Sequence, residues 1–163
     1  MHKVQIDVQD YGSIIVELDE IAAPLTVANF LELAGAGFYD GLTFHRVIDG
    51  FMIQGGDPEG TGMGGADKNI KGEFTANGVN NPLRHTRGAI SMARSGMPNS
   101  ASSQFFIVHE DSLFLDGNYA AFGKVLEGMD VVDAIATGTP VTDNNGTVQA
   151  AKQPVITKVT VLD

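Results

Sequence analysis

The sequence predicts a mainly β fold, arranged as a barrel or a sandwich, with two helices. Eight short segments are rich in β-branched and aromatic residues, clusters of Gly, Asn, Asp and Pro separate them, and only two segments show apolar residues at helical spacing. Many short strands between turn signals are typical of barrels and sandwiches. The chain of 163 residues has the length of one domain, so we expect a single domain over residues 1–163.

The expected strands follow one another along the chain. The first shows the clearest pattern, because Val4, Ile6 and Val8 alternate with polar residues, as in a strand with one buried face. The eight expected strands are Lys3–Val8, Ser13–Leu18, Leu42–Val47, Met52–Gly55, Ala89–Ala93, Gln104–Val108, Ala120–Val125 and Val155–Leu162.

The two expected helices lie between strands. In Pro24–Gly35, apolar residues recur at i, i+3, i+4 and i+7 behind a proline near the start, and Gly35 stands where a left-handed C-cap is favoured. These apolar residues are Val27, Phe30, Leu31 and Ala34. Gly128–Gly138 carries a shorter apolar stripe that again ends in glycine. We expect the two helices to cover the two open ends of a barrel.

Two long stretches, residues 55–65 and 66–82, are expected to be loops, and loops of this length are usually functional. Gly60-Thr61-Gly62-Met63-Gly64-Gly65 fits a dinucleotide-binding fingerprint by letter, but no helix is expected directly after it. We therefore expect a tightly folded loop, in which the carboxylates of Asp57 and Glu59 are solvated.

Composition excludes several classes of function. A formal net charge of −10 with only ten basic residues argues against nucleic acids and anionic membranes as partners. The absence of cysteine excludes disulfides and thiolate catalysis. No apolar run is long enough to span a bilayer and the N-terminus lacks the features of a signal peptide, so we expect a cytoplasmic protein. Asn145-Gly146-Thr147 matches a glycosylation acceptor, a short pattern that is frequent by chance.

Arg46 stands out as a candidate catalytic group. A guanidinium among so many apolar residues is costly to bury unless it is hydrogen-bonded or serves a function. Gln54 and Gln104, each in an apolar strand, are candidates for that partner; structural hydrogen bonding inside the barrel is their alternative role. No activated nucleophile is recognisable, and no Ser/His/Asp set has a familiar spacing. This inventory suits a reaction in which no covalent bond breaks.

The four histidines show no metal-ligand spacing, so we expect neither a metal site nor a cofactor. His45 precedes Arg46 on an expected strand, so their side chains point to opposite faces. We expect His45 to be a buried histidine whose hydrogen bonds are satisfied.

Seven short motifs run through the central part of the chain. They are Phe44-His45-Arg46, Gly50-Phe51-Met52, Gln54-Gly55-Gly56-Asp57, Ser91-Met92-Ala93, Ser103-Gln104-Phe105-Phe106-Ile107, Leu115-Asp116-Gly117 and Phe122-Gly123-Lys124-Val125. In this order they resemble the motifs of the cyclophilin family of peptidyl-prolyl cis/trans isomerases. The resemblance implies a closed eight-stranded antiparallel β-barrel capped by two α-helices.

By this resemblance, Arg46 takes the position of the catalytic arginine, and ten further residues take substrate-binding positions. The pocket for the proline ring would be formed by Phe51, Met52, Phe106 and Leu115. Gln54 would bond the substrate backbone, Gln104 would border a second, shallower pocket, and Ala93 and Arg94 would contact the peptide on the other side.

Three of the substrate-binding positions depart from the family pattern. Phe114, Tyr119 and Arg94 stand where many eukaryotic members carry tryptophan, histidine and asparagine, respectively. Because that tryptophan contributes to cyclosporin binding in the family, the resemblance implies cyclosporin binding with reduced affinity.

The leading interpretation is a monomeric peptidyl-prolyl isomerase that assists protein folding as a chaperone, with proline-containing peptides and unfolded or folding proteins as partners. The alternative is a peptide-binding module that grips proline-containing segments without turnover, which would not need Arg46. A carbohydrate-binding barrel ranks behind both, because sugars stack on exposed tryptophan or tyrosine and the chain has no tryptophan and only three tyrosines.

Overall fold

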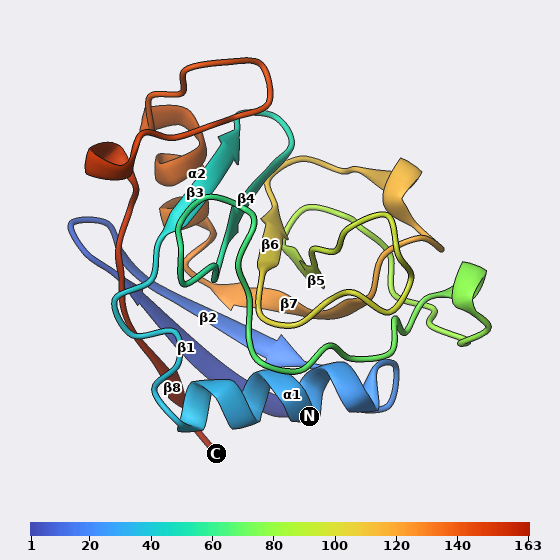
Figure 1. Cartoon of the computed structure of the whole chain (residues 1–163). Coiled ribbons are helices and arrows are strands. Elements are labelled where there is room, and N and C mark those ends of the chain that lie inside the picture. The colour runs from blue at the N-terminus through green and yellow to red at the C-terminus, as the bar shows by residue number, and fades with distance from the viewer.

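The computed structural model describes residues 1–163 as a mainly β fold with two α-helices (Figure 1). The strands are β1 (His2–Val8), β2 (Gly12–Leu18), β3 (Phe44–Ile48), β4 (Met52–Gly55), β5 (Ala89–Met92), β6 (Phe105–Val108), β7 (Ala121–Glu127) and β8 (Ile156–Val161). The helices are α1 (Pro24–Gly35) and α2 (Met129–Gly138), and short 3₁₀ turns occur at Thr75–Asn77, Leu113–Leu115 and Ala150–Lys152.

The eight strands form one curled antiparallel sheet in the order β3-β4-β6-β5-β7-β2-β1-β8. The two edge strands, β3 and β8, share no ladder, and a bridge between Thr43 and Val155 joins them just outside both strands. Next to this bridge, the backbone N–H of Ile156 donates to the carbonyl oxygen of Leu42 (2.7 Å). The expected fold class is confirmed, but the sheet is a curled half-barrel whose seam is held by a few bonds rather than by a continuous ladder.

The main core fills the inside of the curled sheet. Its centre is a group of aromatic side chains: the ring of Phe30, from α1, lies 5.0 Å from that of Tyr39, 5.5 Å from that of Phe105 and 5.4 Å from that of Phe122 between centroids. All four side chains are fully buried. Phe30 therefore holds α1 against the sheet, because its ring packs on residues of both β6 and β7. Packing of this kind dominates the stability of small domains.

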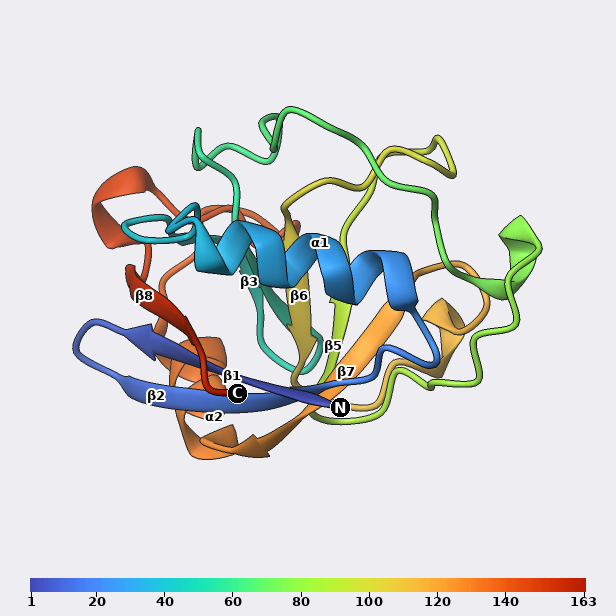
Figure 2. The same cartoon turned by 90° about the horizontal axis from the view of Figure 1, so that it is seen from below.

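The two helices lie at opposite ends of the curled sheet, as both views show (Figures 1 and 2). With 12 and 10 residues, neither is long and apolar enough to cross a membrane. The expected left-handed cap at Gly35 is wrong. Gly35 is still helical and Ala36 has φ −85°, so the left-handed residue is Gly37 (φ +75°), whose N–H donates to the carbonyl of Ala34.

All eight expected strands and both expected helices are present, with ends that differ by at most two residues. Between β4 and β5 the chain forms the expected long loops, interrupted only by the 3₁₀ turn and by a single bridge between Ile70 and Ala101. These loops run along one side of the molecule and carry part of the rim of the site described below.

The close approach of β2 and β7 gives a first prediction. Gly123 lies opposite Leu18, and a Cβ at Gly123 would collide with the backbone oxygen of Glu17. We expect Gly123→Ala to lower the free energy of unfolding by about 1–3 kcal/mol, because the strands must shift apart. Urea unfolding at an unchanged m-value measures this loss.

The matched control for this substitution is Gly35→Ala. Gly35 is helical with open space around its Cα, so alanine there should stabilise the protein by up to about 1 kcal/mol. Similar unfolding midpoints for the two variants would contradict the tight packing at Gly123.

Candidate active site

The guanidinium of Arg46 is held by two amide groups from other segments. Arg46 lies on β3 opposite Gln54 on β4, and its Nη1 donates to the side-chain oxygen of Gln54 (3.1 Å). Its Nε donates to the backbone oxygen of Asn145 (2.8 Å), and its Nη2 to the side-chain oxygen of Asn145 (3.2 Å). Since a guanidinium has five N–H donors, two remain unbonded.

All the groups that hold Arg46 are uncharged, and Arg46 takes part in no ion pair. Burial lowers the pKa of Arg46 below its ordinary value, while Tyr119 and Asp143 act in the opposite direction. An arginine remains protonated at neutral pH even after such a shift. The site therefore contains a positive charge that no carboxylate bonds directly, although Asp143 acts on it through space.

Beside this guanidinium lies a small, mostly apolar pocket of about 110 Å³. It is lined by Arg46, Phe51, Met52, Gln54, Ala93, Arg94, Phe106, Leu115 and Tyr119. The structure thus brings nine of the eleven sequence-predicted site residues into one pocket. The side chains of Met52, Phe106 and Leu115 are buried and form, with two further residues, a small hydrophobic cluster beneath it.

The remaining two predicted residues lie at the edge of this pocket. Phe114 is 73% exposed, and its ring lies 5.6 Å from that of Phe51 between centroids, which places it on the rim. Both amides are expected as partners of Arg46, but Gln104 does not bond the guanidinium. It accepts a hydrogen bond from Nε2 of Gln54 (3.0 Å) instead. Only Gln54 is a direct partner of the guanidinium.

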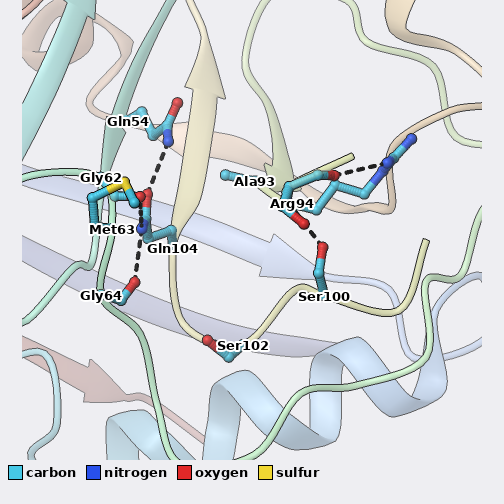
Figure 3. Close-up of a pocket in the computed structure, with 10 residues that line it drawn as sticks. Gln54, Gly62, Met63, Gly64, Ala93, Arg94, Ser100, Ser102 and Gln104 are labelled. Atoms are coloured by element: carbon cyan, nitrogen blue, oxygen red, sulfur yellow. Dashed lines mark hydrogen bonds between the residues drawn. The ribbon is translucent and has the colours of Figure 1, made fainter. Parts of the chain in front are cut away.

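A second pocket of about 200 Å³ adjoins the first and shares three of its residues (Figure 3). It is more polar and is lined by Gln54, Gly62, Met63, Gly64, Ala93, Arg94, Ser95, Ser100, Ser102 and Gln104. Gln104 holds one wall, because its Nε2 donates to the carbonyl oxygens of Gly62 (3.0 Å) and Gly64 (2.8 Å).

Arg94 separates the two pockets. Its guanidinium lies between two aromatic rings, 4.7 Å from the centroid of Phe74 and 4.8 Å from that of Tyr119. It also donates to the carbonyl oxygens of Asn118 (2.7 Å) and Ser95 (3.0 Å). Cation–π contacts and hydrogen bonds together fix the ring of Tyr119 as a wall of the apolar pocket.

A largely buried, hydrogen-bonded set of Asp116, His85 and Ser91 lies behind the floor of the apolar pocket. Nδ1 of His85 lies 2.9 Å from Oδ1 of Asp116, and its Nε2 lies 2.8 Å from Oγ of Ser91. This is a Ser/His/Asp set, but Ser91 and His85 are fully buried, so no substrate carbonyl can reach the hydroxyl. The ring of His85 instead stacks on Phe106 at 5.9 Å between centroids and holds that ring in place.

Two expectations about single residues are wrong. His45 is buried as expected, at 6% exposure, but neither ring nitrogen has a hydrogen-bond partner in the protein. Asp57 is buried rather than solvated, because the loop that follows wraps its backbone N–H groups around the carboxylate, including those of Glu59 (2.8 Å) and Gly62 (2.6 Å).

Burial shapes the protonation of these two groups. It lowers the pKa of the His45 imidazole below its ordinary value, and Asp57 only partly opposes this. Burial alone would raise the pKa of Asp57, but the backbone hydrogen bonds from the loop outweigh it, so this pKa lies below its usual range. His45 is therefore neutral and Asp57 ionised at neutral pH.

Sequence reasoning misses Asn145, which holds Arg46 from a distance of 99 residues along the chain. In the sequence, this residue stands out only as part of a glycosylation pattern. Its Asn-Gly pair is a turn signal, but nothing in a turn signal indicates which strand the turn touches. A bridge between Arg46 and Thr147 fixes this contact, and it joins β3 to a segment that belongs to no strand.

Fold and site together define a class of protein: a small curled β-barrel that presents an apolar pocket next to an unpaired guanidinium. The chain belongs to a family described as cyclophilin-type peptidyl-prolyl cis-trans isomerase, whose model matches residues 3–161. This confirms the resemblance and makes the chain a member of a family of isomerases.

Individual relatives agree with this assignment. The chain is 50% identical over 130 residues to peptidyl-prolyl cis-trans isomerase B of Bacillus subtilis, covering 80% of this chain and 87% of the relative. It is 48% identical over 129 residues to a Helicobacter pylori peptidyl-prolyl cis-trans isomerase, covering 78% and 76%. A Cryptosporidium parvum cyclophilin, crystallised in the presence of the dipeptide Ala-Pro, has a TM-score of 0.86 and 32% identity over 99% of both chains.

The buried histidines give a prediction on stability. Burial lowers the pKa of both His45 and His85 in the folded protein. Below the unfolded value of about 6.5, the unfolded chain therefore binds protons that the folded chain does not. We expect the free energy of unfolding to fall as the pH drops from about 7 to 5, by at most about 1.4 kcal/mol per pH unit for each histidine.

Urea unfolding of the wild type and of His45→Gln at a series of pH values tests this linkage. The variant lacks one of the two groups, so its stability should fall less steeply in the same window. Ionised carboxylates such as Asp57 lose their contribution only below about pH 5, outside this window. Parallel curves for the two proteins would rule out His45 as a source of the pH dependence.

Proposed function

We propose that this protein accelerates cis/trans rotation about X-Pro peptide bonds and thereby assists protein folding. The proline ring occupies the apolar pocket, and Arg46 donates a hydrogen bond to the proline nitrogen. The observation that carries the proposal is the guanidinium of Arg46, which is held by neutral oxygens and keeps two free donors beside a pocket of about 110 Å³.

The reaction is difficult because the amide bond has double-bond character. Delocalisation of the nitrogen lone pair gives a rotational barrier of about 18–20 kcal/mol, so uncatalysed exchange takes tens to hundreds of seconds. As the bond twists, the lone pair becomes localised on nitrogen. A donor aimed at that nitrogen bonds more strongly to the twisted state than to the planar one, which is the requirement for catalysis.

The surroundings of Arg46 suit this role. No carboxylate bonds the guanidinium directly, and its orientation is fixed before the substrate arrives. Burial of the proline ring against Phe106, Met52 and Leu115 withdraws the planar, polar amide from water and positions it against the guanidinium. Gln54 retains one N–H and one lone pair for the substrate backbone.

The required stabilisation is large for one hydrogen bond. An acceleration of about 10⁶-fold corresponds to about 8 kcal/mol. Removal of one preorganised donor in other enzymes costs about 2.7–4 kcal/mol, so the pocket must supply the remainder through positioning and desolvation. Both the donor and the pocket are therefore needed for activity.

Replacing Arg46 tests the mechanism. We expect Arg46→Ala to lower kcat/KM for a proline tetrapeptide by about 10²–10³-fold in a protease-coupled assay, because the transition-state hydrogen bond is lost. Arg46→Lys should recover little of this activity. The ammonium group of lysine cannot donate to Gln54 and Asn145 at the same time in the geometry of the forked guanidinium.

Arg87→Ala provides a matched control. Arg87 is an exposed arginine that pairs with Asp133 of α2 and lines neither pocket, so its loss should leave isomerisation unchanged. Near-full activity of a folded Arg46→Ala variant would overturn the role given to Arg46. A wild-type protein that binds the peptide without accelerating its isomerisation would indicate a peptide-binding module instead.

The pH dependence of turnover provides an independent test. Arginine stays protonated. His45, which precedes Arg46 in the chain, and His85, which stacks on Phe106, have lowered pKa values and are neutral above about pH 7. We expect kcat/KM to be nearly constant between about pH 7 and 9. A bell-shaped profile in this range would mean that a titrating acid or base takes part.

A further inference from the structure

The turn that holds Arg46 contains a chemically labile pair, Asn145-Gly146. This turn belongs to the connection between α2 and β8, which passes beside β3 (Figure 1). The backbone nitrogen of a glycine that follows asparagine can attack the asparagine side chain, because a glycine has no Cβ to hinder the approach. Such a pair is prone to deamidation, which replaces a neutral amide by a carboxylate.

Both members of the pair are needed where they stand. Gly146 has φ +79°, and a Cβ on it would collide with the backbone oxygen of Val47, so only glycine fits. The carbonyl of Gly146 also accepts a hydrogen bond from the N–H of Val47 (2.9 Å). Asn145 supplies two of the oxygens that hold the guanidinium of Arg46. Replacing either residue would therefore disturb the contact with β3 or the position of Arg46.

The reacting groups of this pair are available. The side chain of Asn145 is exposed, and its Nδ2, which would leave, donates no hydrogen bond within the protein. The N–H of Gly146, which would attack, makes only a long bond to the carbonyl of Asp143 (3.3 Å). Nη2 of Arg46 donates to Oδ1 of Asn145 (3.2 Å), the atom on which negative charge develops during the attack. The guanidinium thus polarises the amide in the direction of the reaction.

The chain contains a second pair of the same kind, Asn77-Gly78, in a different setting. Asn77 is half-buried, and its Nδ2 donates to the carbonyl of Gly72 (2.8 Å) and to Oδ1 of Asn99 (2.9 Å). Its leaving group is therefore held by two acceptors, and no side chain donates to its own Oδ1. This pair should react more slowly, so it serves as a reference within the same molecule.

We propose that Asn145 is a modification site, and that its deamidation lowers the activity of the isomerase. The nitrogen of Gly146 bonds to Cγ of Asn145 while the bond between Cγ and Nδ2 breaks, and ammonia leaves with the proton of the attacking N–H. Water then opens the cyclic imide at either carbonyl and gives aspartate or isoaspartate, each of which releases a proton and becomes negatively charged. The effect on activity rests on the proposed function, whereas the reaction itself does not.

A carboxylate at position 145 gives Arg46 the direct anionic partner that the native site lacks. Hydrogen bonds to an ionised group are about twice as strong as neutral ones, so the carboxylate competes with the proline nitrogen for the guanidinium. In isoaspartate, the lengthened backbone also displaces the carbonyl oxygen that accepts from Nε of Arg46 (2.8 Å). Both products therefore weaken the hydrogen bond that acts in the transition state.

The first test follows the reaction in the wild-type protein. The protein is incubated at mildly alkaline pH, and mass-spectrometric peptide mapping measures aspartate and isoaspartate at positions 145 and 77. We expect position 145 to convert several times faster than position 77, with isomerase activity falling in step. Conversion at position 145 that is no faster than at position 77, or full activity of the converted protein, would overturn the proposal.

Asn145→Asp reproduces one product directly. We expect kcat/KM for a proline tetrapeptide to fall by about tenfold, mainly through kcat, which is less than the loss from removing the arginine. Added salt should restore part of this activity, because it screens an exposed ion pair. Asn145→Ala removes the same side-chain acceptor without adding a charge, so it should lose less activity and respond less to salt.

Asn77→Asp is the matched control, because it adds the same charge at the other pair and lines neither pocket. It should keep the kcat/KM of the wild type. Equal losses in Asn145→Asp and Asn145→Ala, without an effect of salt, would reduce Asn145 to a structural support and contradict the charge effect. If the wild type isomerises no proline peptide, the proposed function fails. The comparison of positions 145 and 77 by mass spectrometry still decides whether Asn145 is a modification site.

Discussion

The structure depends on one electrostatic constraint: the guanidinium of Arg46 must be held firmly without being neutralised. In a chain with twice as many acidic as basic residues, a carboxylate partner would be the common outcome. The β3–β4 register instead places Gln54 opposite Arg46, and the bridge between Arg46 and Thr147 brings the side-chain and backbone oxygens of Asn145 to the guanidinium. The neutral oxygens of Gln54 and Asn145 fix the orientation of the guanidinium, and its positive charge remains available to a substrate.

The alternation of side chains along β4 and β6 places the site on the outer face of the curled sheet. Ile53, Phe105 and Ile107 point into the main core, whereas Met52 and Phe106 belong to the small cluster beneath the pocket. Because the period of a strand is two, the same short segments build the core and the pocket floor. A pocket built on strands in this way is rigid. Asp116 also holds the ring of His85, and that ring stacks on Phe106 in the pocket floor.

The sequence predicts elements well because strand and helix patterns are local. Nine of the eleven expected site residues meet in one pocket. For Arg46, Met52, Gln54 and Phe106, the spacing along β3, β4 and β6 fixes their face. The other five lie outside the strands and are expected only from the family resemblance. Contacts between distant segments are not encoded in any local pattern, so Asn145 is missed and the partner of Gln104 is wrongly expected. The burial of Asp57 is missed for a similar reason: a polar loop sequence does not reveal that its own N–H groups enclose the carboxylate.

The glycine-rich loop after β4 explains why a dinucleotide fingerprint is misleading here. A phosphate-binding loop needs backbone N–H groups that point at the ligand. In this loop, the N–H groups of Thr61 and Gly62 already bond the carboxylate of Asp57 at 3.1 and 2.6 Å, so the protein supplies its own anion. The positive φ angles of Gly60 and Gly62 allow the chain to fold around that carboxylate. The loop becomes a fixed wall beside Gln104, and the side chain of Met63 is left exposed on it.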